Sequence, residues 1–236
     1  MNTVSDPKKL EVVFASRRSE EELSDSHVMA SINRLPKERR PKILAVYDNS
    51  ASLPTIYNSR IESDRDVDYL LFVHDDVWID DYFFVERICE GLEQFDVIGV
   101  AGSRSAAPNQ AGWLFKNADL EQTDIRNVSV GVAHGASPGG DVITRAGPWK
   151  MKCDLLDGVF LAVKKQTLLD KNVRFDPSFR FHHYDLDFCR TASRAGLTLG
   201  TWPICITHSS GGSFRSEAWK SSYERYVQKW EREATA

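Results

Sequence analysis

The sequence predicts an α/β fold with a mostly parallel central sheet that is covered by helices on both faces. Short apolar runs alternate with helical patterns through the first hundred residues, which gives a βαβαβ order. The run Tyr69–Val73 is apolar along its whole length, as in strands that are buried on both faces. The chain has 236 residues, of which 42% are hydrophobic, and this is enough for one sizeable core or two small ones.

The first half predicts alternating strands and helices. The expected strands cover residues 10–15, 42–47, 69–73 and 97–101. The expected helices cover residues 20–35, 54–62 and 80–94. Ser19 and the acids behind it are a start signal for the first helix. The third helix carries an apolar stripe at four-residue spacing, formed by Phe84, Ile88 and Leu92.

The second half begins with a segment, residues 102–150, that is rich in Gly, Ala, Ser and Asn. Its part Gly131–Gly147 contains five glycines and a proline, so we expect little core and a mobile loop there. Regular structure resumes with a strand at 159–163, a helix that follows Asp185 and ends at Gly196, strands at 198–202 and 204–207, and a last helix at 217–231. We see no linker, so we predict a single domain over 1–236, which consists of an alternating half at 10–101 and a less regular half at 102–236.

Composition argues against several classes of protein. The net charge is −4 and the densest basic run, Lys37–Lys42, is short, so we expect no nucleic-acid partner. No apolar stretch approaches the roughly 20 residues that span a bilayer, although contact with a membrane surface stays open. The polar start, Met1–Lys9, does not resemble a signal peptide. The four cysteines are far apart and form no CxxC pair, which favours reduced thiols and a cytoplasmic protein.

Polar groups follow several of the predicted strands. In open α/β sheets, ligands bind beyond the carboxyl ends of the strands, so these groups are the first candidates for a site. They are Ser16–Arg18, Asp48–Ser50, His74–Asp76 and His208. All four can converge on one crevice. For Ser16–Arg18, a simple solvent-exposed strand end explains the sequence equally well.

The cluster His74-Asp75-Asp76 favours a metal site. Two adjacent carboxylates repel each other, and after a buried strand they are tolerated when a cation or donor groups compensate them. Mg²⁺ and Mn²⁺ prefer carboxylate oxygens and often add phosphate oxygens of a ligand. The alternative is a helix start, but Asp80 and Asp81 already fill that role four residues later.

The second dense cluster is the run 181–187, FHHYDLD. Asp185 lies near the start of a helix, where its carboxylate either caps the helix or points into the cleft. On a helix, the side chains of Asp185 and Asp187 point in different directions, so only one of them can face the cleft. The alternative for Asp187 is an ion pair with Arg190, three residues further on. The paired histidines at 182 and 183 have no Cys or Glu at zinc-like spacing, so a zinc site is weakly supported.

These motifs, in this order, resemble the family 2 type of glycosyltransferases, which have the GT-A fold. The nearest pattern is that of a bacterial subgroup, the glycosyltransferase like family. The resemblance covers about Leu10 to Trp230. It is carried by the segments 72–77 (FVHDDV), 157–163 (DGVFLAV), 182–189 (HHYDLDFC) and 208–211 (HSSG).

The resemblance implies roles for individual residues. Asp48 matches the acid that contacts the nucleobase, and Asp76 matches the last acid of the DxD motif that binds the metal. Asp185 matches the catalytic base. Two positions depart from the family pattern, because His74 stands for the first acid of the DxD motif and Tyr184 for the usual Glu. The first departure leaves Asp75 as the compensating acid.

Three groups of site residues follow from the resemblance. The nucleotide-binding group is Ser16, Arg17, Asp48, Asn58, Asp75 and Asp76. The metal ligands are Asp76, the late histidine His208, and His74. The contacts to the donor sugar or acceptor are Asp157, Gly158, His183 and Tyr184.

The implied reaction is an inverting transfer from a nucleotide-diphosphate sugar to the hydroxyl of a saccharide, lipid-linked or protein acceptor. A UDP-sugar is the first candidate for the donor. It implies Mn²⁺ or Mg²⁺ as cofactor, and the segment 131–147 as a loop that closes over the ligands. A nucleotidyltransferase is a weaker alternative, because the turn Ser16–Ser19 is basic but has no glycine. The other alternative is a sugar- or nucleotide-binding module without turnover. It stays open because His74 and Tyr184 replace acids of the family pattern.

Overall fold

A six-stranded sheet forms the centre of the computed structural model, which describes residues 6–23 and 26–234. Its strand order is β11-β5-β10-β3-β1-β2. Strand β1 is parallel to β2 and β3, β11 is parallel to β5, and β10 runs antiparallel to both of its neighbours. The bounds are β1 Leu10–Ala15, β2 Lys42–Val46, β3 Tyr69–Val73, β5 Val97–Gly99, β10 Phe160–Lys164 and β11 Leu199–Thr201. The prediction of a mostly parallel sheet is therefore confirmed.

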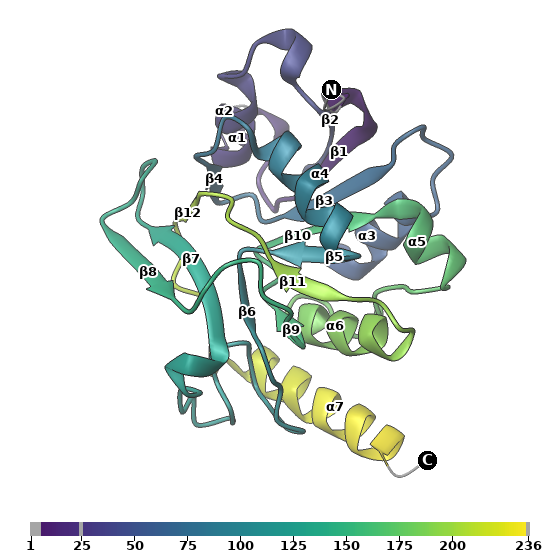
Figure 1. The fold of residues 1–236 in the computed structure, drawn as a ribbon, viewed down its shortest axis with the longest axis vertical. Coiled ribbons are helices and arrows are strands. Elements are labelled where there is room, and N and C mark those ends of the chain that lie inside the picture. The colour runs from purple at the N-terminus through teal and green to yellow at the C-terminus, as the bar shows by residue number, and fades with distance from the viewer. Residues whose placement is uncertain (1–5, 24–25, 235–236) are drawn as a thin grey trace.

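Helices cover both faces of this sheet (Figure 1). Side chains of β1 alternate between two cores, with Val12 and Phe14 on one face and Val13 on the other. Helices α2 and α4 pack into the first core, and α3, α5, α6 and α7 into the second. The helices are α1 Glu20–Leu23, α2 His27–Asn33, α3 Leu53–Ile61, α4 Phe84–Gln94, α5 Lys165–Asp170, α6 Tyr184–Arg194 and α7 Glu217–Ala234, with 3₁₀ turns at Pro7–Lys9, Lys37–Arg39 and Ile125–Asn127.

Two predicted helices differ from the structure, since one is divided and the other begins later than expected. The single helix at 20–35 is two short ones, because Ser26 has an extended ψ of 152° and its hydroxyl caps α2 by accepting a hydrogen bond from the Met29 N–H. Residues 24 and 25 lie outside the described part of the chain. Helix α4 begins at Phe84 rather than at residue 80. Asp81 instead accepts a hydrogen bond from the Phe83 N–H at 2.8 Å and holds a turn ahead of the helix.

A second sheet lies against the first, and the sequence did not predict it. Its strand order is β4-β12-β7-β6-β9, with β8 paired to β7. The predicted strand at 97–101 is divided, because its residues 97–99 belong to the first sheet and residue 101 begins β6 in the second. The bounds are β4 Val77–Ile79, β6 Ala101–Ser103, β7 Val128–His134, β8 Val142–Ala146, β9 Leu155–Leu156 and β12 Ile206–His208.

The glycine-rich segment 131–147 forms a β-hairpin, so the prediction of a loop was wrong for its two strands, whereas the expectation of little core is confirmed. Strand β7 pairs antiparallel with β8 from Val130 opposite Ala146 to His134 opposite Val142. The hairpin projects from the body of the molecule in Figure 1. Within residues 131–147 Val132 is buried, but Val142 and Ile143 are exposed, so the segment contributes little to the core.

The glycines of this segment serve the backbone of the hairpin. Gly131 leaves room for the ring of Trp149, because a Cβ there would lie 2.6 Å from it. Gly147 has φ +65°, and a Cβ there would lie 1.9 Å from the carbonyl oxygen of Val128. A glycine-rich composition favours loops, but it also occurs in hairpins where another side chain or the backbone approaches closely.

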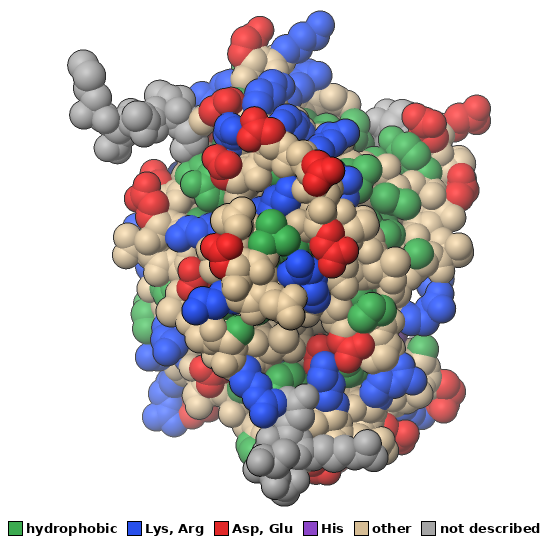
Figure 2. Space-filling model, turned by 90° about the vertical axis from the view of Figure 1, so that its right-hand side faces the viewer, with side chains coloured by type: hydrophobic (Ala, Val, Ile, Leu, Met, Phe, Trp, Pro, Cys, Tyr) green, Lys and Arg blue, Asp and Glu red, His purple; other side chains and the backbone are tan. Residues whose placement is uncertain are grey.

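Surface charge, cysteines and helix hydrophobicity can be compared with what the composition predicts. Basic and acidic side chains intermingle on the face shown in Figure 2. The four cysteines form no disulfide bond, and Cys89, Cys153 and Cys189 are buried. Over residues 6–23 and 26–234, no helix is both long and apolar enough to cross a membrane. Strands β10 and β11 come from the second half of the chain and complete the sheet of the first half, so the two predicted halves share one sheet.

Candidate active site

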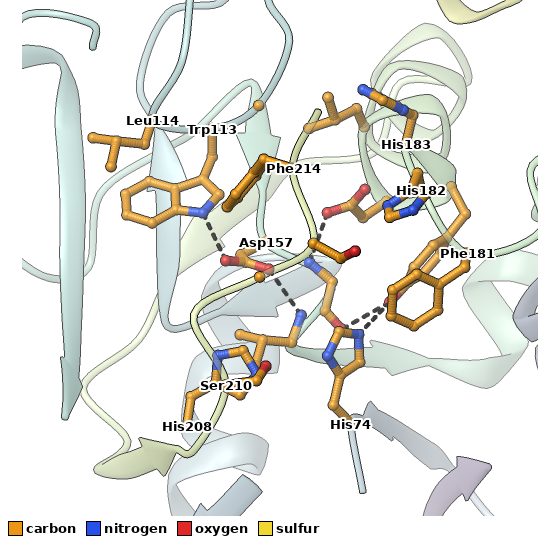
Figure 3. A pocket seen from close by; sticks show the side chains of 18 of the residues that line it. His74, Trp113, Leu114, Asp157, Phe181, His182, His183, His208, Ser210 and Phe214 are labelled. Atoms are coloured by element: carbon orange, nitrogen blue, oxygen red, sulfur yellow. Dashed lines mark hydrogen bonds between the residues drawn. The ribbon is translucent and has the colours of Figure 1, made fainter. Parts of the chain in front are cut away.

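A cavity of about 510 Å³ opens at the carboxyl ends of β1 and β3, where ligands bind in open α/β sheets. One wall is the start of α6 and another is the inner face of the β7–β8 hairpin, through Val130, Val132, His134 and Thr144. The segments 111–115 and 210–214 also line the cavity. Figure 3 shows the polar side chains gathered around the last of these segments.

Three potential metal ligands meet on one side of the cavity. Ligand atoms of His74, Asp76 and His208 lie within 4.8 Å of one another. The antiparallel pairing of β4 with β12 brings them together, because it places His208 opposite Val77. One carboxylate and two imidazoles are donors that suit a first-row divalent cation, so the residues present fit the predicted metal.

Asp76 and His208 form a charged pair. The His208 Nε2 lies 3.3 Å from the Asp76 Oδ1. Burial alone would raise the pKa of Asp76, but the hydrogen bond and charge of His208 hold that pKa below its usual value. Burial alone would lower the pKa of His208, and Asp76 raises it above the usual value. The Asp76 carboxylate is therefore ionised at neutral pH, as a cation ligand must be.

His74 is held from the side of α6. Its Nε2 lies 3.1 Å from the hydroxyl oxygen of Tyr184, and that hydroxyl donates to the carbonyl of Gly158 at 3.0 Å. Burial lowers the pKa of His74, so its ring is neutral at pH 7. Its neighbour Asp75 also lines the cavity. The Tyr184 hydroxyl, predicted to contact a sugar, is thus already engaged by two protein groups.

Asp185 faces the cavity from the first turn of α6. The helix begins at Tyr184, so Asp185 does not cap it, and its Oδ2 accepts a hydrogen bond from the Gly158 N–H at 2.9 Å. Burial and the charge of Asp157 raise the pKa of Asp185 to about 7. A carboxyl with a pKa near the operating pH is suited to accept and release a proton.

Asp157 is held between an indole and the backbone. Its Oδ2 accepts from the Nε1 of Trp113 at 2.6 Å, and its Oδ1 accepts from the Val159 N–H at 3.0 Å. Both bonds fix the orientation of the carboxylate. Trp113 was not predicted as a site residue. The signal that could have found it is an aromatic run, residues 113–115 (WLF), inside a segment that is otherwise small and polar.

Asp187 points away from the cavity, and its predicted pairing with Arg190 was wrong. It is fully buried, and its Oδ1 pairs with the Nζ of Lys229 at 2.7 Å and accepts from the Trp230 Nε1 at 3.0 Å. Arg190 instead bonds the hydroxyl of Tyr226. Lys229, Trp230 and Tyr226 all lie on α7, more than 30 residues away, so the spacing along α6 did not show them.

His183 lines the cavity in the left-handed backbone region, at φ 61°. Its Nδ1 lies 3.1 Å from the Ser222 hydroxyl, and its ring packs against Trp219 of α7 at a centroid distance of 5.1 Å. Burial lowers the pKa of His183 to about 3, so the ring stays neutral. Its neighbour His182 also lines the cavity.

Four predicted nucleotide contacts lie outside the described lining of this cavity. Ser16 and Arg17 follow β1, and the turn after β2 joins them, since the Asn49 N–H donates to the Ser16 carbonyl at 2.8 Å. Asp48 adopts φ 44° in that turn and is exposed. Asn58 lies on α3, and its amide group bonds the backbone of Phe175 through both its oxygen and its nitrogen. The structure therefore gives Asn58 a packing role rather than a place in the cavity.

A parallel-rich sheet with helices on both faces and a cavity at its strand ends is the arrangement of the GT-A fold. A family model described as the glycosyltransferase like family matches residues 14–230. The chain belongs to this family.

Two solved structures share the fold at low sequence identity. A GalNAc-T7 structure with UDP, GalNAc and Mn²⁺ superposes with a TM-score of 0.55 at 11% identity, over 93% of this chain and 47% of that chain. A mannosyltransferase from Pyrobaculum calidifontis, in complex with GDP-Man and Mn²⁺, superposes with a TM-score of 0.50 at 10% identity, over 99% of this chain and 67% of that chain. A comparison with curated proteins gave no match.

Proposed function

We propose that this chain transfers a sugar from a nucleotide-diphosphate sugar to an acceptor hydroxyl, with inversion at the anomeric carbon. A UDP-sugar is the first candidate for the donor. The observation that carries the proposal is Asp185. It is a cavity-facing carboxyl with a pKa of about 7, and it is separate from the His74, Asp76 and His208 cluster. An inverting transferase needs such a division between a base and a set of charge-stabilising ligands.

Asp185 removes the proton of the acceptor hydroxyl as its oxygen attacks the anomeric carbon. The new carbon–oxygen bond forms while the bond to the nucleotide diphosphate breaks, and the diphosphate leaves with the electron pair. The Gly158 N–H holds the Asp185 carboxylate in place for this step. Asp157, held by Trp113, is placed to accept hydrogen bonds from sugar hydroxyls.

His74, Asp76 and His208 would hold a divalent cation, Mn²⁺ or Mg²⁺, which when bound would stabilise the charge that develops on the leaving diphosphate. The two solved structures named above contain Mn²⁺ with UDP or GDP-Man, which supports this assignment. Asp48, with Ser16 and Arg17 beside it, is proposed to contact the nucleoside beyond the cavity. The acceptor is a saccharide, a lipid-linked sugar or a protein.

The test begins with binding. We expect a UDP-sugar with Mn²⁺ to raise the melting temperature more than either component alone, because a ligand that binds only the folded state stabilises it. Donor turnover is then measured as released UDP, with and without excess chelator, for a panel of UDP- and GDP-sugars. Full turnover in excess chelator would contradict the metal role. A panel without any stabilising donor would contradict the proposed reaction.

A further inference from the structure

The hydroxyl of Tyr184 joins a proposed metal ligand to the loop that holds the proposed base. It donates to the Gly158 carbonyl at 3.0 Å and lies 3.1 Å from the His74 Nε2. A phenol has one hydrogen, and a carbonyl can only accept. Because that hydrogen goes to Gly158, the phenol oxygen must accept from His74, and the proton of His74 is therefore on Nε2.

This assignment decides which nitrogen of His74 can bind a cation. A neutral imidazole has one N–H and one lone pair, so a proton on Nε2 leaves the lone pair on Nδ1. Figure 3 shows the nitrogen that is not bonded to Tyr184 on the side of the ring that faces His208 and Ser210. The other two proposed ligands lie in that direction, within 4.8 Å of the His74 ligand atom.

The surroundings are built around this hydroxyl. Tyr184 is only 2% exposed, and its ring packs against Tyr57 and Phe175. A Cβ on residue 158 would lie 2.3 Å from the Tyr184 hydroxyl oxygen and 2.9 Å from the Asp185 Cβ. Gly158 thus accepts from Tyr184 through its carbonyl and donates to Asp185 through its N–H. Its missing side chain is what lets both residues approach.

We propose that Tyr184 is a positioning residue, which fixes His74 in the tautomer that directs Nδ1 at the divalent cation. In this way α6 orients both the base and one metal ligand. The inference rests on the proposed function, in that it takes His74 to be a ligand. It gives a role to the residue that stands where the family pattern has Glu.

The first experiment is a titration of Mn²⁺ in the presence of saturating UDP, with free Mn²⁺ followed by electron paramagnetic resonance. Tyr184→Phe keeps the ring and removes the hydroxyl. Loss of a group that orients a metal-bound histidine costs about 10–100-fold in metal affinity, and this is the weakening that we expect. Tyr226→Phe is the matched control, because it removes the hydroxyl of another buried tyrosine, whose partner is Arg190. Its Mn²⁺ affinity should equal that of the wild type.

The same titration in a His74→Ala background tests whether Tyr184 acts through His74. Adding Tyr184→Phe to His74→Ala should cause no further loss, since the group that it positions is gone. An undiminished effect in that background would overturn the inference, as would wild-type affinity in Tyr184→Phe itself. If the wild type binds no Mn²⁺ with UDP, the proposed function fails, which is a different outcome.

A measurement on the wild type alone keeps the inference testable if the variant does not fold. Nitrogen-15 spectra of the histidine rings distinguish a protonated Nε2 from a protonated Nδ1. Without metal, His74 should have its proton on Nε2, and Tyr184→Phe should give a mixture of tautomers. A wild-type ring with its proton on Nδ1 would refute the assignment.

Discussion

The two sides of α6 carry the same chemical group in opposite settings. Asp185 faces the cavity, where its only described partners are backbone N–H groups and its pKa is about 7. Asp187, two residues on, faces α7 and pairs with Lys229 and Trp230. The comparison shows that a buried carboxylate with a cationic partner holds two helices together, whereas one without such a partner is poised to exchange a proton.

The largest expected effect comes from Asp185→Asn, which keeps the shape and still accepts the Gly158 hydrogen bond. Without a base, turnover should fall by about 10²–10⁴-fold while nucleotide affinity stays near that of the wild type. Steady-state kinetics and a nucleotide titration measure the two quantities. Normal turnover in this variant, together with loss of turnover in Asp187→Asn, would exchange the two roles.

The same variant should be more stable than the wild type at pH 8. The folded-state pKa of Asp185 is about 7 against an ordinary value of 3.8, so the folded state binds this proton more tightly. Stability from this group is therefore present below about pH 4 and lost as the pH rises to about 7. Asn does not ionise, so the difference in melting temperature should be large at pH 8 and shrink at pH 4. An equal difference at both pH values would contradict the raised pKa.

The second effect concerns Asp48, an acid outside the cavity. It sharpens the comparison between Asp185 and Asp187. Asp48 is exposed at the end of β2 and is proposed to contact the nucleoside. Asp48→Ala should weaken the binding of nucleotide diphosphate by about 1.5–3 kcal/mol, as for a lost hydrogen bond to a charged group. Melting temperature without ligand should hardly change. Calorimetric titration with UDP measures the affinity, and an unchanged value would remove Asp48 from the site.

The third effect is on stability alone. Asp187→Asn leaves the Lys229 ammonium facing an amide and should lower the free energy of unfolding by about 1–3 kcal/mol. Lys229 keeps a second partner in Asp176, at 2.9 Å, which limits the loss. Urea denaturation measures this value, and turnover per folded molecule should stay near that of the wild type. A variant that unfolds like the wild type but turns over slowly would break the comparison.

The smallest effect is a shift in a pH profile. Turnover should rise with pH through a single ionisation near 7, because Asp185 must be ionised to accept a proton. The charge of Asp157 is the second cause of that raised pKa, after burial. Asp157→Asn should therefore move the acidic limb of the profile to lower pH, whatever it does to the maximal rate. A limb that stays in place would separate Asp157 from the base.

The main sheet and the candidate acids could be predicted from the sequence, because both depend on local order. The alternation of apolar runs places β1 and β3 at the bounds that we expected. The rule that ligands bind at strand ends then selects His74–Asp76 and His208 without a structure. The apolar stripe of α6 and the glycine after it predict the helix on which Asp185 lies.

The partners of these residues could not be predicted, because they are brought together by contacts between distant segments. Trp113 reaches Asp157 across 44 positions, Tyr184 reaches His74 across 110, and Lys229 reaches Asp187 from another helix. The β7–β8 hairpin was missed for a related reason. Its glycines favour a loop locally, and only packing against Trp149 and Val128 shows why a strand requires them.

The sequence by itself determined the fold class, the strand ends at which chemistry can occur and the acids available there. It did not determine which of Asp185 and Asp187 faces the cavity, since both lie in the same turn of one helix. The tertiary structure decided this by placing α7, with its lysine and tryptophan, against one side of α6 and the cavity against the other. The physical reason is that a carboxyl's pKa depends on burial and on neighbouring charges, and both are set by segments remote in the chain.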